Sequence, residues 1–158
     1  MRNCDIICLM KIFLGADHRG YSLKEFLKKK LEENNYEFED CGNLVYDPND
    51  DYSDFAFKVG KKVKENPGSL GILICGSGAG VCFAVNKIKG IRGALAMNPE
   101  MAKIIKADDD INVLCLASDF IEENLAWEIV KAFLETKFKN EEKYLRRIKK
   151  VEDYEKMN

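Results

Sequence analysis

An apolar run that ends in a glycine-rich turn constrains the fold of this chain more than any other feature. Residues 71–75 read Gly-Ile-Leu-Ile-Cys, and residues 76–80 read Gly-Ser-Gly-Ala-Gly. An apolar run of this length bounded by glycine predicts a buried parallel strand, and Val81–Val85 predict the start of a helix. Cys75 would then lie where a strand ends and a helix begins. Open α/β sheets bind their ligands at that edge.

The same turn predicts an anion-binding site beside a reactive thiol. Glycines let backbone N–H groups come close to an anion, and a helix N-terminus adds partial positive charge. That field also favours thiolate over thiol at Cys75. We therefore expect Cys75 to be a nucleophile or base, with a buried structural thiol as the alternative.

Two other turn motifs fit the sequence less well. A dinucleotide-binding turn places G-x-G-x-x-G after the first strand, whereas these glycines follow the third predicted strand. A cysteine phosphatase loop needs an arginine six positions after the cysteine, and Val81 stands there. The phosphatase reading is therefore discarded, and the dinucleotide reading is the weaker one.

Composition limits the classes of partner. The chain has 158 residues, which predicts one domain over 1–158, with residues 1–10 as an N-terminal extension. A net charge of −2 gives no case for nucleic-acid or membrane partners. The six cysteines and the single histidine, His18, lack zinc-site spacing, so no metal is expected. With no clear export signal, we expect a cytoplasmic protein with reduced cysteines, of which Cys82 and Cys115 should be buried.

Strand and helix patterns alternate along the chain. The predicted strands cover residues 11–16, 36–40, 70–75, 92–97 and 112–117. The predicted helices cover about 23–31, 54–64, 81–88, 98–106, 125–133 and 141–157. This alternation predicts an α/β fold, a three-layer α/β/α sandwich with a Rossmann-like five-stranded parallel sheet. The C-terminal helix, within 140–158, has few apolar positions, so we expect an arm that packs against a partner subunit.

Further polar residues are candidates for a site. Asp17 and His18 end the first strand at the same edge as Cys75, so they predict an acid/base and anion-binding group; the alternative is a turn aspartate and an exposed histidine. The stretch from Asn86 to Arg92 is typical of a helix C-terminus with a glycine cap. Lys143 and Arg147 share one helix face, either as a solvated face or as a phosphate site.

Five motifs occur in an order that resembles the type B ribose-5-phosphate isomerase and galactose-6-phosphate isomerase family over about residues 11–150. They are Gly15-Ala16-Asp17-His18-x-Gly20-x-x-Leu23-Lys24, Asp51-Tyr52-x-Asp54-Phe55-Ala56, the 71–80 segment above, Ala84-x-Asn86-Lys87-x-x-Gly90-Ile91-Arg92, and Asn112-Val113-Leu114. The resemblance implies interconversion of an aldose phosphate and its ketose through an enediolate, without metal or cofactor. It also implies a homodimer or tetramer whose sites are shared between subunits.

The resemblance also implies roles for individual residues. Cys75 would move a proton between C1 and C2, Asp17 would handle hydroxyl protons, and His18 would contact phosphate. The turn, with Ser77, would hold the enediolate oxygen, which agrees with the anion hole expected from the residues. The substrate-binding residues implied in this way are His18, Tyr52, Gly76, Gly78, Gly80, Asn86, Asp109, Lys143 and Arg147.

The chain departs from the family pattern at the residues that would act on the sugar ring and at those that would bind the phosphate group. Asp108 and Asp109 stand where the family usually has His-Asn, whose histidine opens the furanose ring. Aspartate has an unperturbed pKa of about 4, too low for an efficient acid at neutral pH. Asp119 replaces a phosphate-binding arginine, and Lys143 with Arg147 fill two arginine positions. Three accounts follow: a ribose 5-phosphate isomerase, an enzyme for another or an open-chain sugar phosphate, and a weakly active binding or partner subunit.

Overall fold

Five parallel strands form the centre of the molecule. The computed structural model describes residues 10–158, so Cys4, Cys8 and all but Met10 of the expected N-terminal extension lie outside it. The strands are β1 (Lys11–Ala16), β2 (Glu37–Asp40), β3 (Leu70–Cys75), β4 (Gly93–Leu95) and β5 (Val113–Ala117). Their order in the sheet is β2-β1-β3-β5-β4, and every neighbouring pair is parallel. The predicted Rossmann-like α/β sheet is confirmed.

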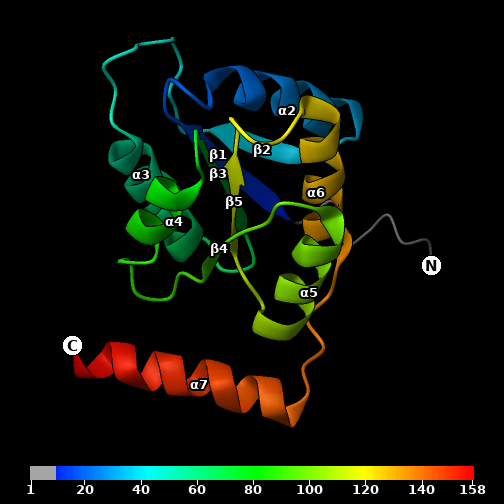
Figure 1. Cartoon of the computed structure of the whole chain (residues 1–158). Helices are drawn as coiled ribbons and strands as arrows, with labels where there is room; N and C mark the ends of the chain where they lie inside the picture. Colours follow the sequence, from blue (N-terminus) through cyan, green and yellow to red (C-terminus); the bar gives the residue numbers. More distant parts are fainter. Residues whose placement is uncertain (1–9) are drawn as a thin grey trace.

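Helices cover both faces of this sheet (Figure 1). One face carries α2 (Tyr21–Glu33), α5 (Pro99–Asp109) and α6 (Glu123–Glu135), and the other carries α3 (Tyr52–Glu65) and α4 (Ala79–Val85). Apart from Lys11 at the start of β1, the central strands β1, β3 and β5 have no polar side chain, because successive side chains enter opposite cores. In β1, for example, Ile12 and Leu14 pack under the first set of helices and Phe13 packs under the second.

Small residues bring α3 close to the sheet. A Cβ atom on Gly15 of β1 or on Gly71 of β3 would come within 2.8 Å of a methyl group of Val59. The two glycines therefore let Val59, in the middle of α3, rest directly on the strands. This contact places the beginning of α3 beside the carboxyl ends of β1 and β3.

Two elements are shorter than the sequence predicts. The helix expected to reach Ile88 ends at Val85, because the Asn86 amide turns back and bonds backbone groups of Cys82 and Gly93. The strand expected over 92–97 covers only Gly93–Leu95. By contrast, α5 begins as predicted, since Asn98 Oδ1 accepts a hydrogen bond from Met101 N at 2.7 Å and Pro99 occupies the first helical position.

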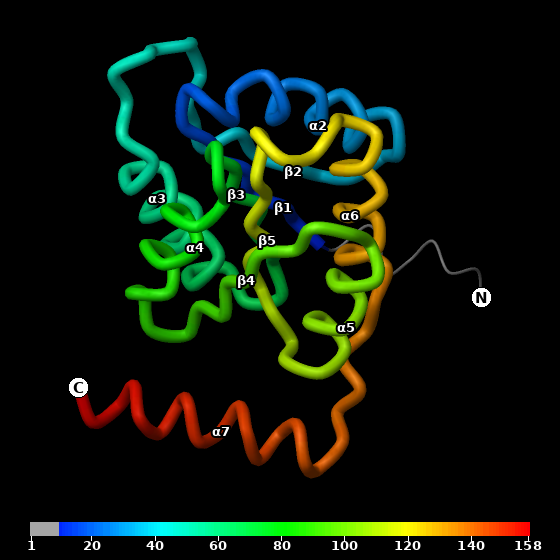
Figure 2. The backbone as a smooth tube through the Cα atoms, viewed as in Figure 1, coloured from blue at the N-terminus to red at the C-terminus, as the bar shows by residue number. Residues whose placement is uncertain are grey.

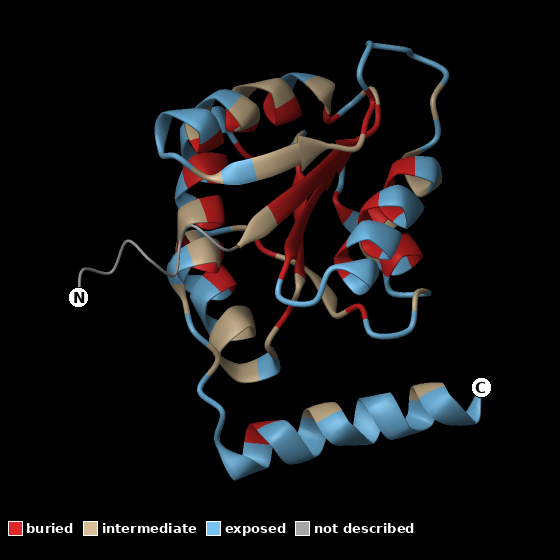
Figure 3. Cartoon of the chain, turned by 180° about the vertical axis from the view of Figure 1, so that it is seen from behind, coloured by how far each residue is buried: buried red, intermediate tan, exposed pale blue. Residues whose placement is uncertain are grey.

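The last helix, α7 (Glu142–Met157), is an arm that crosses one end of the molecule (Figure 2). Tyr144 is its one buried residue, and Figure 3 shows most of the remaining arm exposed. Its exposed apolar side chains are Leu145, Val151, Tyr154 and Met157. Among residues 10–158, no helix is both long and apolar enough to cross a membrane.

Candidate active site

The carboxyl ends of the three central strands meet at one edge, as the sequence predicts for Asp17 and Cys75. Asp17 N donates to Ile74 O at 3.3 Å, which joins the end of β1 to the end of β3. Ser118 N donates to Cys75 O at 2.9 Å, and Asp119 N donates to Gly76 O at 3.0 Å. These bonds hold the residues that follow β1, β3 and β5 next to one another.

Cys75 is the last residue of β3 and is 4% exposed. Its side chain belongs to the core beneath α3 and α4, together with Val81 and Cys115. The thiol therefore lies directly below the start of α4, at the edge of the apolar core. The predicted position between strand and helix is found.

The glycine turn lies above this thiol. Gly78 has a φ of 72°, and a Cβ atom there would meet Leu95 at 2.6 Å, so a larger residue would not fit. Ser77 is exposed, and its hydroxyl oxygen accepts a hydrogen bond from Ala79 N at 3.3 Å. The first N–H groups of a helix have no acceptor within the helix, so the amides at the start of α4 point toward this edge.

Tyr52, the first residue of α3, lies against the same turn. A Cβ atom on Gly80 would come within 2.9 Å of the Tyr52 ring, which also packs edge-to-face on Phe83 with centroids 5.9 Å apart. The structure thus places Tyr52 beside Gly80, which is the position that a residue lining a substrate site at this turn has to occupy.

Asp17 is a buried carboxyl group at the end of β1. Its Oδ1 accepts hydrogen bonds from Arg19 N at 3.0 Å and Gly20 N at 3.1 Å. Burial raises the pKa of Asp17 above its usual value, although these two amides and His18 partly oppose the change. A carboxyl group with a raised pKa is better suited to exchanging protons near neutral pH.

His18 is held by a residue of the loop that precedes α3. Asp50 Oδ1 lies 2.8 Å from His18 Nδ1 and also accepts a hydrogen bond from His18 N at 2.8 Å. The side-chain hydrogen bond to Asp50 raises the pKa of His18, and the charge of Asp17 acts in the same direction. The imidazolium form is favoured, which suits contact with an anion.

Arg19 provides a fixed positive charge at this edge. Its guanidinium group lies directly against Gly76, where an added Cβ atom would clash with it, and it forms an ion pair with Asp119. A carboxylate alone at this position would repel phosphate, but the ion pair with Arg19 neutralises the charge of Asp119. A surface cavity of about 440 Å³ opens beside Arg19, between the start of α2 and the segment after β5.

The thiols expected to be buried differ from one another. Cys115 is fully buried, whereas Cys82 is only half-buried, so the expectation for Cys82 is wrong. A hydrogen bond from Cys115 lowers the pKa of Cys82 to about 7 despite partial burial. Asn86 Nδ2 also lies 3.8 Å from Cys82 Sγ. Cys82 is thus a thiol that can ionise near neutral pH.

The remaining predicted residues lie at the opposite, amino-terminal edge of the sheet. Helix α5 runs back from the carboxyl edge, so Asp108 and Asp109 end it near the start of β5, beside α7 (Figure 1). Lys143 and Arg147 both lie over the Tyr144 ring, 4.8 and 5.8 Å from its centroid. The structure brings these residues together, but within one subunit it does not bring them to Cys75.

Asp108 is an ion-paired carboxylate. Lys139 Nζ lies 2.6 Å from Asp108 Oδ1 and 3.3 Å from the Tyr144 hydroxyl. The hydrogen bond from Lys139 lowers the pKa of Asp108. A raised pKa, which an aspartate replacing a ring-opening acid needs, is therefore not found within one subunit.

Asn86 also lies away from the turn. Its side chain donates to Cys82 O and Gly93 O, both at 2.9 Å, and accepts from Gly93 N at 2.8 Å. These bonds tie the end of α4 to β4, which agrees with the reading of this stretch as a helix C-terminus.

Sequence reasoning missed three residues of these clusters. Arg19 fell on a variable position of its motif, Asp50 lay in a polar loop, and Lys139 preceded the last helix. The opposite charges of Arg19 and Asp119, each just after a predicted strand, were a usable signal. The contacts of Asp50 and Lys139 follow from loop conformation and left no periodic signal. Within residues 10–158, no group of three or more His, Cys, Asp or Glu side chains is placed to hold a metal ion.

Comparisons with known proteins give concordant matches. The Ribose/Galactose Isomerase family model matches residues 12–151. Ribose-5-phosphate isomerase B of Mycobacterium tuberculosis is 36% identical over 146 residues, which are 92% of this chain and 90% of that protein. The crystal structure of ribose-5-phosphate isomerase B from Mycoplasma genitalium with bound ribulose-5-phosphate superposes with a TM-score of 0.91 at 42% identity, covering 94% of this chain and 98% of that one. The Clostridium thermocellum ribose-5-phosphate isomerase B superposes with a TM-score of 0.90 at 36% identity, covering 94% and 99%.

Proposed function

Because this chain belongs to the ribose/galactose isomerase family, we propose that it interconverts ribose 5-phosphate and ribulose 5-phosphate by a cofactor-independent isomerisation. Such an enzyme is an intramolecular oxidoreductase of carbohydrate metabolism. The observation that carries the proposal is the placement of Cys75 beside Asp17 and beneath the glycine turn, in a chain that matches these isomerases along most of its length. A cytoplasmic location fits this role.

The proposed reaction moves one proton between two carbons. The Cys75 thiolate takes the proton from C2 of the open-chain aldose, and the C1 carbonyl becomes the oxyanion of an enediolate. Amides of the glycine turn and the Ser77 hydroxyl stabilise that oxygen, as preorganised donors do. Cys75 then returns the proton to C1, while Asp17 accepts a proton from the C2 hydroxyl and delivers one to the C1 oxygen. The thiolate is regenerated and no electrons leave the substrate.

The phosphate end combines residues of this edge with residues of the arm. His18 and Arg19 lie next to the turn, and Arg19 supplies a guanidinium group close to Gly76. Lys143 and Arg147 lie at the far edge, so we propose a homodimer in which they reach the phosphate bound at the partner's Cys75 edge. Asp108 and Asp109 would approach the sugar ring of that site in the same way. Asn86 acts on this site only through the position of α4.

A second candidate function is a sugar-phosphate-binding subunit with little activity. The Asp108–Lys139 ion pair favours it, because a carboxylate with a lowered pKa is a poor proton donor for ring opening. An isomerase turns over the cyclic form of the sugar phosphate, whereas a binding subunit binds it with little turnover.

An assay of the purified protein with ribose 5-phosphate and ribulose 5-phosphate tests both functions. We expect turnover in both directions and exchange of the transferred proton with solvent. Cys75→Ala should lower kcat by about 10²–10⁴-fold, the range of general acid–base catalysis, while Cys82→Ser, the matched control at a nearby cysteine, should stay active. Wild-type protein that binds ribulose 5-phosphate without turnover would establish the binding subunit, and an active Cys75→Ala variant would refute the proposed base.

A further inference from the structure

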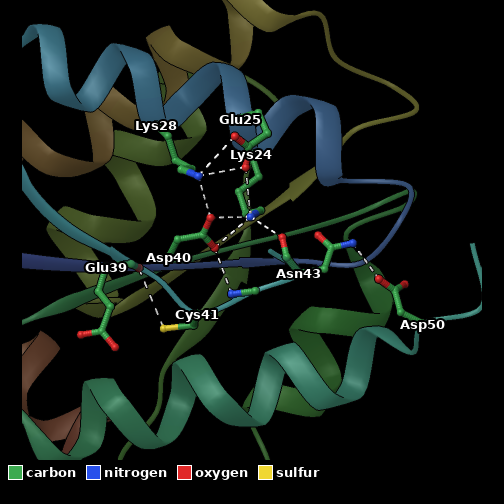
Figure 4. A network of polar contacts seen from close by, with 9 residues as sticks. Lys24, Glu25, Lys28, Glu39, Asp40, Cys41, Asn43 and Asp50 are labelled. Carbon is green, nitrogen blue, oxygen red and sulfur yellow. Dashed lines mark hydrogen bonds and ion pairs between the residues drawn. The ribbon is translucent and has the colours of Figure 1, made fainter. Parts of the chain in front are cut away.

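The loop between β2 and α3 contains an anchored chain of polar contacts that ends on His18. Lys24 is fully buried in α2, and its ammonium group donates to Asn43 O at 2.6 Å and to both carboxylate oxygens of Asp40, at 2.6 and 2.8 Å (Figure 4). Asn43 N also donates to Ala16 O at 3.0 Å. The beginning of the loop is thereby fixed to both α2 and β1.

Asn43 connects the fixed beginning of the loop to Asp50. The Asn43 side-chain amide donates to Asp50 Oδ2 at 2.7 Å, as Figure 4 shows. Asp50 Oδ1 is then directed at His18, where it meets both the backbone N–H and Nδ1 at 2.8 Å. The Asp50 side chain is 9% exposed and that of His18 is 29% exposed, so the carboxylate is shielded while the ring remains accessible.

This geometry decides which ring nitrogen is available. A carboxylate at Nδ1 holds a proton on that nitrogen, so Nε2 is the nitrogen left for a ligand. When His18 is protonated, Nε2–H is a charged donor, which makes shorter and stronger bonds to phosphate than a neutral one.

We propose that Asp50 is a positioning residue for the isomerase site: held by Asn43, it fixes the His18 ring with Nε2 toward the substrate and maintains the charged form that receives the phosphate group. The role rests on the proposed function, since it concerns phosphate at the same site. The charged groups that face His18 are Asp50 from the loop and Asp17 from the end of β1, and both favour the imidazolium.

Because His18 is the only histidine of the chain, its titration can be followed directly by NMR in the full-length protein. The wild-type pKa should lie above 6.5, the usual value for histidine. Asp50→Asn should lower it, and Asp47→Asn, an exposed carboxylate of the same loop, should leave it unchanged. Equal titration curves for wild type and Asp50→Asn would overturn the proposal, and this outcome does not depend on isomerase activity.

Steady-state kinetics and inorganic phosphate test the role in binding. At a pH between the His18 pKa values that NMR gives for the wild type and for Asp50→Asn, the variant should raise KM for ribose 5-phosphate and the inhibition constant of inorganic phosphate together, by up to about five- to tenfold, as expected when a charged donor becomes neutral. The kcat value should change little, and the pH above which KM rises should move to lower pH. A loss of kcat with both constants unchanged would overturn the positioning role. Lack of turnover in the wild type would instead refute the proposed function, with NMR and phosphate binding still reporting on Asp50.

Asp50→Asn should fold. Asn43 Oδ1 is buried and has no hydrogen-bond partner among the described residues, so the Asn43 amide can turn over and accept a bond from an asparagine amide at position 50. Asp50→Ser removes the same charge with a smaller side chain, and thermal unfolding of both variants checks the fold. Concordant results from the two variants assign the effect to the missing charge.

Discussion

At the scale of single residues, the Arg19–Asp119 pair changes the charge at the carboxyl edge of the sheet. The family pattern has an arginine after the last strand, and Asp119 stands at that position here. Asp119 forms an ion pair with Arg19, which follows β1. A guanidinium group is therefore kept close to Gly76, although it comes from another strand and is paired with Asp119. An arginine bound on one side by a carboxylate still has N–H groups that can bind phosphate.

Removal of this guanidinium should weaken binding more than chemistry. We expect Arg19→Ala to raise KM for ribose 5-phosphate by about ten- to a hundredfold, the loss of a charged hydrogen bond, with kcat changed much less. Steady-state kinetics measure both values. Reversal of the pair, Arg19→Asp with Asp119→Arg, should recover part of the lost affinity. An unchanged KM in Arg19→Ala would show that Arg19 only neutralises Asp119.

At the scale of elements, buried strands were predictable and loop contacts were not. The bounds of β1 and β3 agree with the sequence because strands buried on both faces are continuously apolar. The end of α4 was misplaced because Asn86 stops the helix by bonding to β4, a contact that helical periodicity does not encode. Asp50 was missed for a similar reason, since it reaches His18 across 32 positions of the chain.

Lys24 shows how one contact fixes two elements. Its ammonium group is buried between α2 and β2 on Asp40. Burial by itself would raise the pKa of Asp40, but hydrogen bonds from Lys24 and Lys28 lower it overall. A lowered pKa in the folded state means that this stabilisation is present above the unfolded pKa of 3.8 and is lost as the pH falls below it.

We expect Lys24→Met to lower the free energy of unfolding by about 3 kcal/mol, because it removes one partner of a buried ion pair. Urea unfolding at pH 7 measures the change. The matched control is Lys28→Met, whose ammonium group binds the same carboxylate at 2.8 Å but is partly exposed, and its cost should be smaller. Asp40→Asn added to Lys24→Met should restore part of the stability. If Lys24→Met lowered the free energy of unfolding by no more than Lys28→Met does, the expectation that burial makes the Lys24–Asp40 contact the stronger one would be contradicted.

At the scale of the whole molecule, the proposed site residues form two groups at opposite edges of one sheet. Cys75, Asp17 and the glycine turn lie at the carboxyl edge, whereas Asp108 and the Lys143–Arg147 pair lie at the other edge with α7. The two apolar cores share this one sheet, and we propose that the described residues 10–158 form a single domain. Under the proposed shared site, such a domain would be complete only when the arm of a second copy reaches its carboxyl edge. The exposed apolar residues of α7 are a suitable surface for that contact.

A shared site predicts complementation between two inactive proteins. One carries Cys75→Ala, and the other carries Lys143→Ala with Arg147→Ala. In a two-fold dimer of the two, one site carries both lesions and the other carries none, so random pairing should recover about one quarter of wild-type activity. Coexpression followed by kinetics measures the recovery, and sedimentation should show dimers or larger assemblies at micromolar concentration. If each chain contained a complete site of its own, the mixture would stay inactive, because every subunit would keep its own lesion.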